Sequence, residues 1–472
     1  MSQPLISDIA SRVQKGEASA VQLVEDALSL AESKTEFDAI ISFNRQRALD
    51  LADKIDTDVK AGKKVGRLAG VPFIAKDNFL TLSGKTTAAS NILKPFEAVY
   101  QATAINRLEA EGAICIAKSN LDAFAHGSST ENSDFFVTKN PRDKTRVPGG
   151  SSGGSAASVA LQIVPFALGT DTGGSIRLPA SFCGVVGYKP SYGLVSRSGV
   201  IAMASSTDVI GPLARSVEDA ALVLDVMSGR DSLDSTTIER DKTAYTDLTY
   251  DLKGKKVGLI KEYFSEGLEA GVRSQVEAAV DKLKSAGAEV SEVSLPSLPL
   301  ALAIYYIICP AEVSSNLSRY DGQRYGYSDS SATSLEESYE LSREKGFGAE
   351  AKRRIMIGAH VLSSGYYDAY YKKAQTVRTK IINEFAQAFK EHDLLVGPVS
   401  PTTAFKIGEK TTDPLAMYLT DIMTVAANIS GNPAISVPAG EADGLPVGLQ
   451  IIAGYGNDRQ LLAAARAFEE LG

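Results

Sequence analysis

The sequence PGGSSGGSAAS occupies residues 148–158, and GTDTGGSIRLP occupies residues 169–179. Each of these loops is bordered by apolar sequence rather than by more polar sequence, so we expect both to lie within the folded body. Consecutive glycines let backbone N–H groups converge on one point, and converging N–H groups bind negative charge. Two such loops in one chain indicate a functional site rather than a pair of linkers.

Glycine-serine loops also serve as turns, as close packing points and as phosphate cradles. A Walker-type loop needs Lys followed by Ser or Thr at the end of its glycine run, and neither loop has that pair. A dinucleotide fingerprint needs Gly-x-Gly-x-x-Gly, and residues 149–154 do not match that spacing. Phosphate binding is therefore the weaker hypothesis, and a plain turn stays open for either loop taken alone.

Strand and helix signals alternate on both sides of the loops, which predicts an α/β fold. Apolar runs predict strands at 71–75, 113–117, 256–260, 288–293, 394–396, 434–437 and 447–452. Helical spacing is seen at 6–32, 103–111, 216–229, after the strand at 256–260 as far as about 286, at 353–360, 365–392 and from 458 onwards. Ser19 followed by Gln22 is typical of a capping box. No repeat, Pro-rich linker or low-complexity tract divides the chain, so we expect one compact domain.

The amino-acid composition limits the classes of function that the chain can have. The 472 residues carry a formal net charge of -8, with 44% hydrophobic and 22% charged residues, as in ordinary globular proteins. An acidic balance without a Lys/Arg block argues against direct binding of a nucleic acid across a broad face. Three widely spaced cysteines, Cys115, Cys183 and Cys309, fit neither a disulfide framework nor a zinc site, and they favour a reducing cytoplasm.

The beginning of the chain gives no sign of export. Met1-Ser2-Gln3-Pro4 lacks the basic and apolar regions of a signal peptide. No stretch approaches the roughly 18 unbroken apolar residues of a membrane span. We therefore expect a soluble, cytoplasmic protein without a membrane partner.

The small number of histidines limits the choice of a catalytic base. Only His126, His360 and His392 are present, and the last two lie on predicted helices. His126 is therefore the main histidine candidate for the base of a Ser–His–Asp triad. A serine nucleophile in these loops would then use a lysine. Lys76 directly follows the strand at 71–75, where burial would leave a neutral amine able to accept a proton. The alternative is a surface lysine paired with Asp77.

Residues 149–155 and 169–177 together resemble the two serine-containing loops of the amidase signature family. The resemblance implies a single large α/β domain, 1–472, with a central mixed β-sheet flanked by helices. Its parts would be an N-terminal helical preface at about 1–60, a signature core at about 65–230 and a tyrosine-rich helical cap at about 300–392. It also implies a catalytic triad of Lys76 as base, Ser151 as bridging serine and Ser175 as nucleophile.

Motifs outside the loops are similar to those of the family members that supply ammonia for tRNA-dependent amidation. They are GSSTENS at 127–133, FCGVVG at 182–187, SSNL at 314–317, RYDG at 319–322 and SSGYYDAYY at 363–371. His126 departs from the pattern, because an apolar residue is expected there. The chain also ends soon after its final helix.

For this subfamily the resemblance implies glutamine as substrate. The backbone of Thr172, Gly173, Gly174 and Ser175 would form the oxyanion hole. Glutamine would be bound by residues outside the triad: Ser128, Tyr305 or Tyr306, Arg354 and Asp421. The alternative for the two charged residues is an ordinary helix surface, especially for Arg354, which follows Lys352 and Arg353.

The resemblance further implies a heterotrimer. A B subunit would use ATP and Mg to activate Glu-tRNA(Gln), or Asp-tRNA(Asn) in other settings, and a small C subunit would clasp this chain. The tRNA would be bound only indirectly, and no metal or organic cofactor is expected in this chain. Two rival hypotheses remain, a stand-alone amidase for another small amide and a non-catalytic anion-binding scaffold.

Overall fold

The structure is a computed structural model that describes residues 4–472. Met1, Ser2 and Gln3, on which part of the expectation about export rests, lie outside the described residues. The described strands are β1 (Ile40–Phe43), β2 (Pro72–Lys76), β3 (Ile114–Ser119), β4 (Phe166–Asp171), β5 (Val186–Lys189), β6 (Val209–Ala214), β7 (Lys256–Ile260), β8 (Glu289–Val293), β9 (Leu394–Pro398), β10 (Ala434–Ala442) and β11 (Leu445–Ile452).

The described strands form one mixed sheet in the order β1-β3-β2-β4-β6-β5-β10-β11-β9-β7-β8. Parallel pairs join β2 to β3 and β4, and β7 to β8 and β9. The remaining pairs are antiparallel. The predicted α/β class with a mixed sheet is confirmed, and each of the seven predicted strand runs coincides with a strand.

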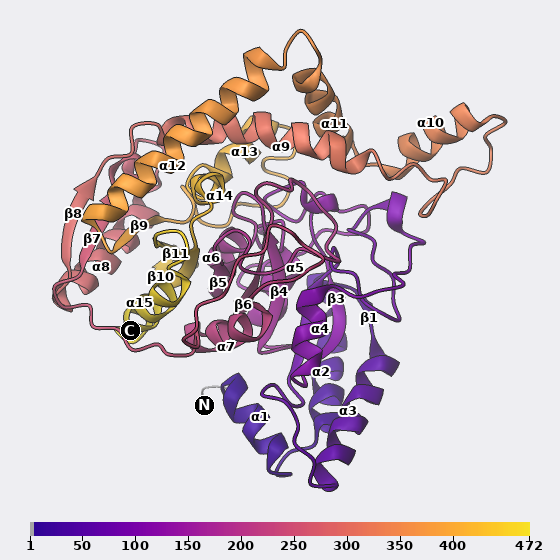
Figure 1. Cartoon of the computed structure of the whole chain (residues 1–472), viewed down its shortest axis with the longest axis horizontal. Helices are drawn as coiled ribbons and strands as arrows, with labels where there is room; N and C mark the ends of the chain where they lie inside the picture. Colours follow the sequence, from indigo (N-terminus) through magenta and orange to yellow (C-terminus); the bar gives the residue numbers. More distant parts are fainter. Residues whose placement is uncertain (1–3) are drawn as a thin grey trace.

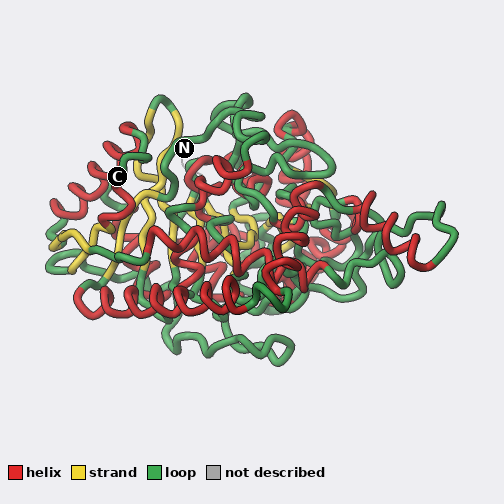
Figure 2. The backbone as a smooth tube through the Cα atoms, turned by 90° about the horizontal axis from the view of Figure 1, so that it is seen from above, coloured by secondary structure: helices red, strands yellow, loops and turns green. Residues whose placement is uncertain are grey.

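Helices cover the sheet and close both ends of the molecule (Figure 1). They are α1 (Ile6–Gln14), α2 (Ala20–Ser33), α3 (Arg45–Lys60), α4 (Thr103–Ala110), α5 (Gly153–Ala160), α6 (Arg177–Cys183), α7 (Val217–Met227), α8 (Ala270–Ser285), α9 (Ala301–Leu317), α10 (Leu335–Gly346), α11 (Ala349–Leu362), α12 (Lys373–Glu391), α13 (Pro414–Tyr418), α14 (Val425–Ser430) and α15 (Asp458–Glu469). In Figure 1, α1 to α3 lie at the base, whereas α9, α11 and α12 arch over the top. Figure 2 shows the α10 region projecting from one end of the molecule.

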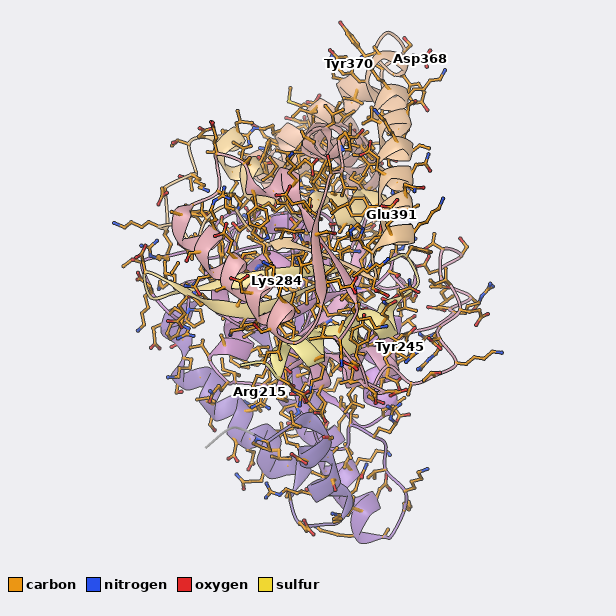
Figure 3. All side chains as sticks on the ribbon, turned by 90° about the vertical axis from the view of Figure 1, so that its left-hand side faces the viewer. Arg215, Tyr245, Lys284, Asp368, Tyr370 and Glu391 are labelled. Atoms are coloured by element: carbon orange, nitrogen blue, oxygen red, sulfur yellow. The ribbon has the colours of Figure 1, made fainter. Side chains whose placement is uncertain are left out.

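Two predicted helical segments differ in detail from the structure. The segment 6–32 is two helices, because Gly16 turns the chain with a φ of 72° and α2 begins anew after Ser19. Ser19 accepts a hydrogen bond from the Gln22 backbone N–H at 3.3 Å, as a capping residue should. The segment 365–392 starts with a π-type turn, Asp368–Lys372, before regular α12 begins. Figure 3 shows Asp368 and Tyr370 at the outer end of this long helix and Glu391 toward its other end.

Apolar side chains fill the space on both faces of the sheet. In β2, Phe73 and Ala75 belong to one buried cluster, and Ile74 between them belongs to the other. This alternation is what a strand requires when helices cover both of its faces. The carboxyl end of β2 is therefore enclosed by the protein, and that end is where Lys76 lies.

Helix α9 and the short turn before it form a long apolar segment. The segment Leu298–Leu317 is long and apolar enough to cross a membrane, with a mean hydropathy of 1.4, which the sequence analysis did not anticipate. Half of its apolar window is buried inside the structure, and α9 packs against α11, α12 and α14. Apolar residues such as Ile308 and Val313 belong to the main buried cluster. These contacts are those of a core helix.

Candidate active site

Lys76 is the last residue of β2, and its side chain is fully buried. Its Nζ atom lies 2.7 Å from Oγ of Ser151 and 2.9 Å from Oγ1 of Thr170. The Asn78 side-chain amide donates to the same Thr170 hydroxyl at 3.1 Å. The structure therefore brings Lys76 and Ser151 into direct contact. It also adds Thr170 and Asn78, which the sequence analysis did not single out.

The alternative prediction, that Lys76 is a surface lysine paired with Asp77, is wrong because Asp77 has another partner. The carboxylate of Asp77 forms an ion pair at 2.8 Å with Lys118 on β3, and both side chains are fully buried. Lys118 also donates to the Phe79 carbonyl at 2.8 Å. This pair fixes the chain immediately after β2, so that Lys76 is left to turn toward the glycine-serine loops.

The register of the sheet explains why the residues meet. Because β2 and β4 are parallel neighbours, their carboxyl ends lie at the same edge, and Thr170 lies one residue before the end of β4. Ser151 reaches this edge from the loop that precedes α5. The peptide bond between Gly150 and Ser151 is cis. Three segments far apart in the chain thus converge at the end of one strand.

Burial changes the protonation of Lys76. Desolvation lowers its pKa from the usual 10.5 to about 7, although the nearby carboxylates of Asp122, Asp171 and Asp208 act in the opposite direction. At neutral pH a large fraction of Lys76 is therefore uncharged. A neutral amine has two N–H groups and one lone pair, so it can donate to Thr170 while accepting from Ser151.

Ser175 lies at the start of the turn that leads into α6, and 8% of its surface is exposed. Its backbone carbonyl accepts a hydrogen bond from the Ser152 N–H at 3.1 Å, which ties the two loops together. Within residues 4–472, no hydrogen bond joins the hydroxyls of Ser151 and Ser175. Catalytic contacts of this kind often tighten only when substrate binds.

The turn at 172–175 has no room for side chains at its two glycines. A Cβ on Gly173 would lie 2.8 Å from the ring of Tyr305, and one on Gly174 would collide with Oγ1 of Thr424. Gly174 also has a φ of 140°, which favours glycine. In the described part of the chain, the N–H groups of Gly173, Gly174 and Ser175 donate to no other backbone group. They are therefore available to an oxyanion.

A fully buried ion pair stabilises the same turn. Arg177 donates to Asp171 through Nη2 at 2.9 Å and through Nε at 3.0 Å. Although burial raises the pKa of Asp171, the charge of Arg177 brings it down to about 2. Asp171 also accepts from the Ile176 N–H at 3.1 Å, while the Thr172 hydroxyl donates to Asp208 at 2.7 Å. Both ends of the turn are thus anchored by carboxylates, of which Asp171 is buried and Asp208 half-buried.

A cavity of about 240 Å³ contains Ser128 and Arg354 in its lining. The Ser128 hydroxyl donates to Asp421 Oδ2 at 2.8 Å, and the hydroxyl of Tyr306 lies 3.4 Å from the same oxygen. Burial raises the pKa of Asp421 to about 7, against the effects of Ser128 and Arg354. Ser128, Tyr306 and Asp421 are therefore brought together, as a common binding role requires.

Arg354 is not on a helix surface. It is 3% exposed, whereas the side chain of the preceding Arg353 is 43% exposed. Its guanidinium group lies 5.5 Å from the ring centre of Tyr306 and 5.7 Å from that of Tyr418. Glu350 accepts from Arg354 Nε at 2.8 Å. This support fixes a buried positive charge at the cavity wall.

The two adjacent tyrosines have different surroundings. Tyr306 is within reach of Asp421 and stacks on Tyr418, with ring centres 3.9 Å apart. Tyr305 is 3% exposed and packs against the Gly173 backbone. The structure thus associates Tyr306 with Asp421 and with Tyr418, a residue of the cavity wall, and Tyr305 with the oxyanion turn. Among residues 4–472, no cluster of three His, Cys, Asp or Glu side chains is placed to hold a metal ion.

The fold and the lysine–serine contact define the class of protein. A family model described as Amidase matches residues 22–462, and the chain therefore belongs to the amidase family. Within that family, the chain is similar to the A subunit of the glutamyl-tRNA(Gln) amidotransferase of Geobacillus kaustophilus. The two are 51% identical over 467 residues, which is 98% of this chain and 96% of that protein.

Solved structures agree with this relationship. The A subunit of the glutamyl-tRNA(Gln) amidotransferase from Thermotoga maritima has a TM-score of 0.79 and 42% identity, covering 96% of this chain and 91% of that one. A peptide amidase from Stenotrophomonas maltophilia has a TM-score of 0.84 and 29% identity, covering 99% of this chain and 97% of that one. The resemblance seen in the sequence motifs is confirmed over nearly the whole chain.

The lowered pKa of Lys76 predicts the pH dependence of amide hydrolysis. Because only the neutral amine accepts a proton, we expect kcat at saturating substrate to fall about tenfold per pH unit below pH 7, and to level off above about pH 8. Lys76→Arg should be inactive throughout, because a guanidinium group stays charged. Lys284→Arg, the same change at a side chain that is 54% exposed, is the matched control. A flat profile between about pH 5 and pH 9 would contradict this role.

Proposed function

We propose that this chain is the glutamine-hydrolysing subunit of a tRNA-dependent amidotransferase. One observation carries the proposal: a buried Lys76, whose pKa burial lowers to about 7, lies 2.7 Å from Ser151, at the edge of the sheet that also holds Ser175. A base that touches a hydroxyl within a glycine-serine site suits acyl transfer from an amide.

The chemistry follows from these positions. Lys76 accepts the proton of Ser151 as Ser151 accepts that of Ser175, and Ser175 Oγ attacks the carboxamide carbon. The N–H groups of the 172–175 turn stabilise the oxyanion, and losing one such donor typically costs about a hundredfold or more in rate. The Lys76–Ser151 pair returns a proton to the leaving nitrogen, and ammonia departs. Water then cleaves the ester on Ser175, which releases glutamate.

Glutamine recognition is assigned to Arg354 in the cavity wall and to Asp421, which is hydrogen-bonded to the cavity residue Ser128. Arg354 would bind the α-carboxylate, because its buried guanidinium group has donors beyond the one that Glu350 accepts. Asp421 would bind the α-ammonium group together with Ser128 and the hydroxyl of Tyr306. An arriving ammonium group favours the ionised form of Asp421, which titrates near pH 7 in the free chain. The helical segment 300–392 would act as a cap that supplies Tyr306 and Arg354.

The names of the two similar amidotransferase subunits, from Geobacillus kaustophilus and Thermotoga maritima, support the wider role. We infer that ammonia passes to a B-type subunit, which uses ATP and Mg to activate Glu-tRNA(Gln) or Asp-tRNA(Asn), and that a C-type subunit completes a heterotrimer. The tRNA would be reached only through the B subunit. All three cysteines are free and buried, which fits a cytoplasmic protein.

A stand-alone amidase is the second candidate. The similarity to a peptide amidase favours it, because the name of that protein refers to no tRNA and the fold is the same. The opposite charges of Arg354 and Asp421 distinguish the candidates. A pocket that binds the two charged groups of a free amino acid binds an aryl or fatty amide poorly, because such an amide leaves both charged residues without a partner.

Replacement of the nucleophile tests the proposal. Ser175→Ala should lower ammonia release from glutamine at least about a thousandfold, because the nucleophile is lost. Ser158→Ala is the control, since Ser158 is a buried serine whose hydroxyl donates to the Gly154 carbonyl within α5. Ammonia is measured with glutamine and, in parallel, with aryl and fatty amides. Full activity of Ser175→Ala, or cleavage of the other amides without any of glutamine, would refute the proposal.

Purification from the source tests the partner assignment. A tagged full chain should bring down two further subunits in equal amounts, and the complex should convert Glu-tRNA(Gln) or Asp-tRNA(Asn) only when ATP and glutamine are both present. Ser175→Ala should assemble equally well but should need free ammonia for this conversion. A chain that purifies alone and is fully active on other amides would favour the stand-alone amidase.

A further inference from the structure

His126 lies in the wall of the proposed glutamine cavity. It follows a short helical turn, Ala123–Ala125, and it lines the same cavity as Ser128 and Arg354. The side chain is fully buried. Neither ring nitrogen has a hydrogen-bond partner among the described residues.

The backbone around His126 is well fixed, so its unpaired ring is not the result of a loose loop. Its N–H donates to the Ala123 carbonyl at 3.0 Å, and its own carbonyl accepts from the Asn132 side chain at 2.8 Å. A neighbouring aromatic ring, that of Phe124, has its centre 6.2 Å away and offers no acceptor in the ring plane. Buried polar groups are normally hydrogen-bonded, so an imidazole here calls for a partner from outside the chain.

The charges around His126 indicate which group of the substrate would bind its ring. Burial, together with the positive charge of Arg354, lowers the pKa of His126 well below its usual range, so the ring is neutral. A neutral imidazole carries one N–H donor and one acceptor nitrogen. A carboxylate held beside Arg354 would accept from the N–H, whereas the acidic end of the site is formed by Asp421 and Ser128. The α-carboxylate of glutamine therefore suits this position.

We propose that His126 is a substrate-binding residue that donates a hydrogen bond to the α-carboxylate of glutamine beside Arg354. The assignment rests on the proposed function, since it needs glutamine as substrate. An apolar side chain would fill the same buried place without an unpaired polar group. Substrate binding, rather than stability of the fold, then explains why a histidine occupies this buried position.

The test compares two variants with two substrates in the full chain, purified with its associated subunits. His126→Leu should raise KM for glutamine about tenfold and leave kcat within about twofold, because a hydrogen bond to a charged group is lost. His126→Gln keeps a donor and should raise KM less. With γ-aminobutyramide, which is glutamine without its α-carboxylate, the wild type and His126→Leu should be equal.

Thermal melting in the Ser175→Ala background gives a second readout. His126→Leu should melt at the same temperature or higher without ligand, and glutamine should stabilise it less than the parent. An unchanged KM for glutamine, or equal losses on both substrates, would overturn the assignment of His126. If the wild type releases no ammonia from glutamine, the proposed function fails and this assignment fails with it.

Discussion

The burial of one lysine is the constraint on which the site depends. A charged ammonium group at the end of β2 would have to be paired with a carboxylate, yet the immediate neighbour of Lys76, Asp77, forms its ion pair with Lys118. Lys76 is left with two hydroxyls, those of Ser151 and Thr170. Hydroxyls do not compensate a buried charge, so the amine loses its proton near neutral pH and becomes a base. The catalytic proposal follows from this electrostatic arrangement.

The surrounding fold protects that arrangement with a buried carboxylate, Asp171, and a half-buried one, Asp208, each of which has its own donors. Asp171 is held by Arg177, and Asp208 accepts from Thr172 and from two backbone N–H groups. These charges raise the pKa of Lys76 only in part, because the effect of burial, which lowers it, is larger. The same hydrogen bonds fix the 172–175 turn, whose N–H groups must be in place before the oxyanion forms. Stability of the turn and tuning of the lysine therefore have a common origin.

Much of this could be predicted from sequence, for reasons that are local. The apolar run at 71–75 predicted the strand that buries Lys76, and the glycine-serine loops predicted the turns around Ser151 and Ser175. Strands β1, β4, β5 and β6 were not predicted. In β4 and β6 the reason is that Gly169 and Pro212 interrupt the apolar runs. The contact of Lys76 with Thr170 and the pairing of Asp77 with Lys118 could not be predicted, because they depend on which strands are neighbours. Likewise, only the structure shows that Arg354 packs beside the stacked rings of Tyr306 and Tyr418.

The covalent intermediate provides the most direct measurement of the central claim. The full chain is mixed with glutamine, quenched in acid within one turnover, digested and analysed by mass spectrometry. If a Lys76-activated Ser175 attacks the carboxamide, the peptide that contains Ser175 gains a glutamyl group, and Lys76→Arg forms none. A glutamyl group on Ser151 instead, or ammonia release with no modified serine at all, would contradict the account.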